Sequence, residues 1–102
     1  MREKRSHYRK VVELPVEFSV VGDSDRSVGT CRNLSLGGVH IETETPAPFG
    51  ARITVHLPLA GLGPEGLPGI VRWVKAPKMG VQFGLLGARE TYAITKALAA
   101  ED

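Results

Sequence analysis

Apolar and polar residues alternate with a period of two along most of this chain. From Val12 to Val20 every second residue is apolar, and the residues between are polar or, at position 15, proline. This alternation predicts a β-strand with one face in the core and the other toward solvent. Pro15 has no amide proton for a ladder, so we expect it at a sheet edge or a bulge.

Five more segments have strand character, and residues typical of turns separate them. We expect these strands at Ser27–Leu34, Val39–Glu42, Ile53–Leu59, Ile70–Val74 and Met79–Phe83. Only the last part of the chain changes period, because apolar residues recur at helical spacing between Ala88 and Ala100 in an alanine-rich stretch. The pattern predicts an all-β fold, a six-stranded antiparallel β-barrel with one C-terminal α-helix.

Length and composition limit the class of protein. The chain has 102 residues, of which 42% are hydrophobic and 24% charged, as expected for one soluble globular domain. With Cys31 as its single cysteine, it can form neither an intramolecular disulfide nor a cysteine-based metal cluster. It shows neither the apolar N-terminal run of a signal peptide nor the roughly 20 apolar residues of a membrane span. We therefore expect a cytoplasmic protein without membrane insertion.

The net charge of +2 is small, but basic residues gather at the N-terminus. Arg5 and Arg9 are separated by three residues, a spacing that places both side chains on the same side of a strand or a helix. Two converging guanidinium groups can bind phosphate, pair with guanine or stack on a base. We interpret residues 1–10 as a flexible basic arm, with Lys4 as an additional contact, and residues 11–102 as the barrel with its helix.

A second motif, Asn33-x-Ser35-x-x-Gly38, lies at the connection between the second and third expected strands, and Gly37 precedes its last residue. Asn33 and Ser35 offer short hydrogen-bonding side chains. The glycines allow the backbone to turn sharply or to approach a ligand closely. Alone, the motif is equally what a tight turn requires.

Together and in this order, the two motifs resemble those of the PilZ domain family. The resemblance covers essentially the whole chain and includes Leu14-Pro15-Val16, the segment Asn33–Val39 and the segment Met79–Phe83. It implies a six-stranded barrel with a C-terminal helix that binds cyclic di-GMP as a ligand, without a cofactor and without catalysis.

The resemblance also implies a role for each motif residue. Arg5 and Arg9 would bind guanines and phosphates, Asn33 and Ser35 would contact a guanine, and Gly37 and Gly38 would keep the turn open. Arg72 is either a surface charge or a further contact. We expect a receptor that orders its N-terminal arm on binding and relays the signal to a protein effector not identified by the sequence.

Two other functions stay open. A PilZ-like domain can act by protein contact alone, without a nucleotide. A small barrel for single-stranded nucleic acid would need exposed aromatic residues along a basic groove, but aromatic residues make up only 6% of the chain. We expect Trp73 in the core, and therefore no nucleic-acid partner.

Metal binding and catalysis have little support in the sequence. The three histidines, at positions 7, 40 and 56, lack the spacing of metal ligands, so we expect no metal site. Cys31 is interpreted as a half-buried structural residue. The chain contains neither a phosphate-binding P-loop nor a nucleophile elbow, which argues against an enzyme.

Overall fold

The alternating segments form six strands and the last segment forms one helix in a computed structural model, which describes residues 8–100. The elements are β1 (Lys10–Val20), β2 (Ser27–Leu34), β3 (Gly38–Glu42), β4 (Arg52–His56), β5 (Leu67–Lys75), β6 (Lys78–Phe83) and α1 (Ala88–Ala99). The predicted fold class is confirmed. The boundaries differ most at β4, which ends before the predicted Leu59, and at β5, which begins three residues before Ile70.

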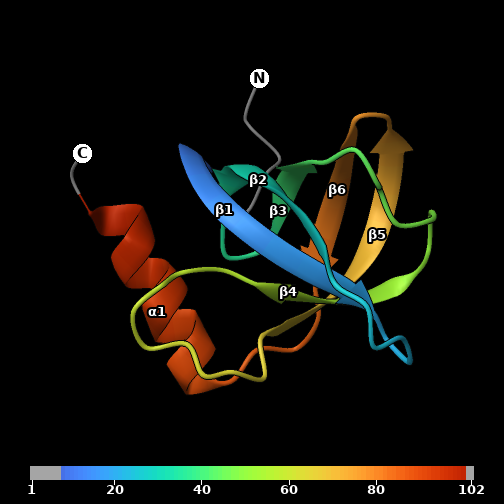
Figure 1. Cartoon of the computed structure of the whole chain (residues 1–102). Coiled ribbons are helices and arrows are strands. Elements are labelled where there is room, and N and C mark those ends of the chain that lie inside the picture. The colour runs from blue at the N-terminus through green and yellow to red at the C-terminus, as the bar shows by residue number, and fades with distance from the viewer. Residues whose placement is uncertain (1–7, 101–102) are drawn as a thin grey trace.

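The strands close into a barrel in the order β1-β2-β3-β6-β5-β4, and all neighbours are antiparallel. The long strand β1 crosses the barrel and pairs with both β2 and β4 (Figure 1). Pro15 pairs with Thr30 of β2, whereas the ladder to β4 begins only at Glu17. Pro15 therefore lies in a part of β1 that has no partner in β4, a position where a proline without an amide proton is tolerated.

The apolar residues that alternate along the strands point inward and form the core of the barrel. Cys31 has no exposed surface, so it is more deeply buried than the half-buried position expected from the sequence. The buried side chains come from every strand and from α1, so the core joins all elements of the fold. The largest fully buried side chains are Phe18, Leu34, Ile41, Ile53, Leu67, Met79 and Ile94.

Helix α1 lies beside the barrel, next to the loop that connects β4 with β5 (Figure 1). Its buried residues Ala93 and Ile94 face the core side, and Ala93 approaches the loop at Gly61. Lys10 Nζ donates hydrogen bonds to the carbonyl oxygens of Ala97, at 3.2 Å, and Ala100, at 2.5 Å. This cation complements the negative end of the helix and ties it to the start of β1. Between residues 8 and 100, the chain contains no helix of the length and apolar character needed to cross a membrane.

Candidate functional site

Three strands of the barrel wall carry β-bulges; β1 and β2 are neighbours, and β3 and β6 lie between β2 and β5. The register shifts occur in β1 after Val11, in β2 before Asn33 and in β5 before Trp73. A bulge exchanges the face on which the following residues lie, and bulges gather next to binding sites. Their result here is a row of directly paired residues across five strands on the outside of the barrel. We call this the outer row: Val11, Asn33, His40, Gly80 and Trp73.

A pocket of about 380 Å³ lies along the outer row, between the start of β1 and strand β5. It contains six of the eight site residues predicted from the sequence. The other two, Lys4 and Arg5, lie outside the described residues. The six are Arg9, Asn33, Ser35, Gly37, Gly38 and Arg72.

The pocket also contains residues that the sequence did not indicate as site residues, among them His40, Trp73, Gly80 and Gln82. The prediction that Trp73 belongs to the core is wrong, because 38% of its surface is exposed. The bulge at Arg72 places two consecutive outward residues in β5, and this turns Trp73 to the outside. Its pairing with Gly80 could not be recognised from the alternation of β5 alone.

The charge of this pocket is positive. Among the described residues that line it are Arg9 and Arg72, and no aspartate or glutamate. Arg72 Nε donates a hydrogen bond of 2.6 Å to Gln82 Oε1 on the neighbouring strand, which fixes the guanidinium on the wall. This bond uses one of the five N–H donors of the group and neutralises none of its charge. An anionic ligand would therefore meet no opposing carboxylate from the described lining.

The side chains of the second motif have two different roles, one in the turn and one in the pocket. Ser35 Oγ accepts hydrogen bonds from the backbone N–H of Gly37, at 3.0 Å, and of Gly38, at 3.2 Å. The Ser35 N–H also donates to the Gly38 carbonyl at 3.0 Å. The hydroxyl therefore holds the turn together. Asn33 lies in the outer row, where it pairs with His40. Among the hydrogen-bonding side chains of the motif, the Asn33 amide is therefore the one that belongs to this row.

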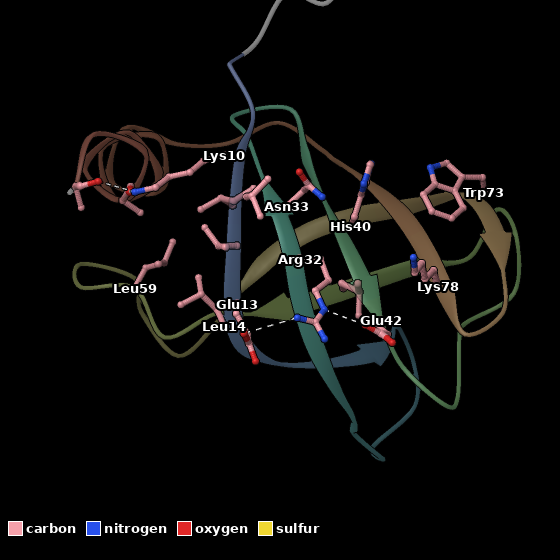
Figure 2. Close-up of a pocket in the computed structure, with 16 residues that line it drawn as sticks. Lys10, Glu13, Leu14, Arg32, Asn33, His40, Glu42, Leu59, Trp73 and Lys78 are labelled. Atoms are coloured by element: carbon pink, nitrogen blue, oxygen red, sulfur yellow. Dashed lines mark hydrogen bonds and ion pairs between the residues drawn. The ribbon is translucent and has the colours of Figure 1, made fainter. Parts of the chain in front are cut away.

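A larger cavity of about 760 Å³ adjoins the pocket and shares Asn33, Leu34, His40 and Trp73 with it. Figure 2 shows that its wall contains a chain of ion pairs, in which Arg32 contacts Glu42 at 2.9 Å and Glu13 at 3.8 Å. These opposite charges largely cancel. We therefore assign the candidate site to the smaller pocket, whose arginines face no carboxylate among the described lining residues.

No three histidine, cysteine, aspartate or glutamate side chains of residues 8–100 are grouped as metal ligands. His40 instead contacts the Trp73 ring, with 5.3 Å between ring centroids. Burial raises the pKa of the Cys31 thiol to about 11, so the thiol stays protonated and unreactive near neutral pH.

Comparisons with known proteins agree with this fold. A family model described as PilZ domain matches residues 3–98. No curated protein matches the sequence. Several solved structures do.

Three of these structures illustrate the likeness. The PilZ domain of CeSA from a cellulose-synthesizing bacterium has 17% identity and a TM-score of 0.72, over 88% of this chain and 93% of that chain. MrkH of K. pneumoniae, in complex with c-di-GMP, has 16% identity and a TM-score of 0.69, over 95% of this chain and 52% of that chain. The PilZ domain of YcgR from Escherichia coli, with c-di-GMP, has 12% identity and a TM-score of 0.62, over 94% of this chain and 95% of that chain. At these identities the likeness establishes the fold.

Proposed function

This chain belongs to the PilZ domain family, and we propose that it is a cytoplasmic receptor that binds cyclic di-GMP without transforming it. The observation that carries the proposal is the pocket beside the outer row, where Arg9, Arg72 and Asn33 lie together without an acidic residue in the described lining. Two structures of similar fold, MrkH and the YcgR domain, hold c-di-GMP.

The chemistry of the pocket fits the chemistry of this nucleotide. Cyclic di-GMP carries two phosphate charges and two guanine bases. Arginine binds phosphate through its planar fork and pairs with O6 and N7 of guanine. Arg9 approaches from the chain before β1 and Arg72 from β5, so the two guanidinium groups reach the pocket from different elements. Arg5, four residues before Arg9, would add a third guanidinium, and Asn33 would hydrogen-bond a base edge.

We also propose how binding is relayed. Arg9 lines the pocket and is followed directly by the first residue of β1. A ligand held by Arg5 and Arg9 would fix the N-terminal residues 1–10 against the barrel and create a surface that a protein effector recognises. Amide exchange in residues 2–10 should slow on saturation with cyclic di-GMP. Unchanged exchange there would contradict the relay and leave the receptor function intact.

Calorimetric titration with cyclic di-GMP tests the receptor function directly. We expect Arg9→Ala and Arg72→Ala each to weaken binding by roughly 1.5–3 kcal/mol, about ten- to more than a hundredfold, because each loses hydrogen bonds to a charged group. Arg89→Ala removes the same charge from an exposed position of α1, outside the pocket, and should bind like the parent. No binding heat from the parent protein would overturn the proposal and favour a protein-interaction module that acts without a nucleotide.

A further inference from the structure

Trp73 occupies an unusual place for a tryptophan in a small barrel. It lies in the interior of β5, yet it faces outward and leaves 38% of its surface exposed. An amphipathic ring at the edge of a pocket is a frequent contact for a ligand. Trp73 also lines the positive pocket, next to Arg72 in sequence.

The neighbouring strands hold the indole in one orientation. Gly80 pairs with Trp73 on one side and with His40 on the other, so the three residues are consecutive members of the outer row. A Cβ on Gly80 would lie 2.0 Å from Trp73 Nε1 and 2.4 Å from Cε2, which means that the indole occupies the space above this glycine. The His40 ring meets the indole at an interplanar angle of 77°, an edge-to-face contact. A ring supported from below and from one side loses little freedom when a ligand covers it.

We infer that Trp73 is a base-stacking residue of the site, supported by His40 across Gly80, and that it binds a purine base of the ligand. The inference rests on the proposed function, which it extends by naming the residue that holds the base. Stacking on Trp73 would place the base between Arg72, which directly precedes Trp73 in β5, and Asn33, which lies further along the outer row. These two side chains can then reach the edge of the base while the indole covers its face. His40 is a positioning residue, because it acts on the base through Trp73.

Trp73 is the only tryptophan of the chain, so its fluorescence reports on this position alone. We expect its emission to change on saturation with cyclic di-GMP. Trp73→Leu keeps an apolar cover over Gly80 but removes the aromatic face, and it should weaken binding roughly 5- to 150-fold, the effect of losing one base–aromatic stack. Trp73→Phe keeps a ring face and should lose much less. Gly80→Ala should weaken binding without removing any polar group, because the new methyl group displaces the indole.

The outcomes separate this inference from the proposed function. Calorimetric binding by the parent protein, combined with an unchanged tryptophan emission or with equal affinity of Trp73→Leu, would overturn the stacking role and leave the receptor function standing. Absence of binding by the parent would overturn the receptor function, and the stacking role with it. Loss of affinity in Trp73→Leu together with retention in Trp73→Phe would support the inference.

Discussion

Gly38→Ala should destabilise the barrel, although Gly38 lines the candidate pocket. A Cβ at this position would lie 2.0 Å from the carbonyl oxygen of Val81 and 3.2 Å from Cα of Gln82. Both obstacles belong to the backbone of β6, so no side-chain rotation relieves the overlap. Strands β3 and β6 would have to separate locally by roughly 1.5 Å, because non-bonded heavy atoms are most stable about 3.5 Å apart or more.

The size of the effect follows from the hydrogen bonds at this end of the β3–β6 ladder. Phe83 N–H donates to the Gly37 carbonyl at 2.8 Å, and Gly38 pairs with Gln82. A separation of this size breaks two or three backbone bonds worth about 0.5–1.5 kcal/mol each, so we expect a loss of roughly 1–4.5 kcal/mol. In a domain of this length each kcal/mol lowers Tm by about 4–8 °C.

Urea denaturation of Gly38→Ala, compared with Gly84→Ala, measures this loss. A Cβ on Gly84 would meet its nearest atom, Pro68 Cβ, at 3.7 Å, an ordinary van der Waals contact. Both substitutions reduce the entropy of the unfolded chain similarly, so their difference isolates the clash with β6. Free energies of unfolding that agree within about 0.5 kcal/mol, the scatter of surface substitutions, would refute the reasoning.

Three further predictions concern the core and the helix. Burial raises the pKa of Cys31 from 9.0 to about 11, so the stability that its thiol contributes is complete below pH 9 and is lost as the pH rises to 11. Over that range urea denaturation should show the parent losing roughly 2–3 kcal/mol more than Cys31→Ala, and parallel pH profiles would contradict this. Lys10→Met should lower the free energy of unfolding by roughly 1–2 kcal/mol and speed amide exchange in α1, because the last helical carbonyls lose their cation. The control Lys75→Met, at an exposed position, should leave amide exchange in α1 unchanged. Thr43→Val should cost about 1–3 kcal/mol in urea denaturation, because the buried hydroxyl donates a 2.8 Å bond to the Val28 carbonyl, and unaltered stability would show that this bond contributes nothing.

The strands were predictable because each must bury one face. The alternation from Val12 to Val20 identifies β1 correctly, and α1 ends within one residue of its predicted end. The end of β4 was less predictable. Leu57 is buried although it lies beyond the strand, so apolar alternation continues where the ladder has already stopped. Burial and hydrogen bonding are separate requirements, and the sequence pattern reports mainly the first.

The site was predictable only in part. The spacing of Arg5 and Arg9 says nothing about their distance from Asn33, and it was the resemblance to a family that joined the two motifs. The register supplies the physical reason, because Val11 of β1 pairs directly with Asn33 of β2 and so brings Arg9 to the pocket. The outward position of Trp73 depends on a bulge, which is set by its partner strand rather than by its own sequence.

Two glycines show how the same residue type can serve folding and binding separately. Gly38 and Gly80 both lie in strands, and neither has a positive φ, so backbone conformation does not require a glycine at either position. Each is needed because another group occupies the place of its side chain: the Val81 carbonyl at Gly38 and the Trp73 indole at Gly80. A backbone cannot move aside without breaking the ladder, whereas an indole can rotate. Gly38→Ala should therefore act mainly on the free energy of unfolding, and Gly80→Ala mainly on the affinity for the ligand. A strand glycine beside an exposed tryptophan is thus a signal for a binding site, one that apolar alternation alone does not give.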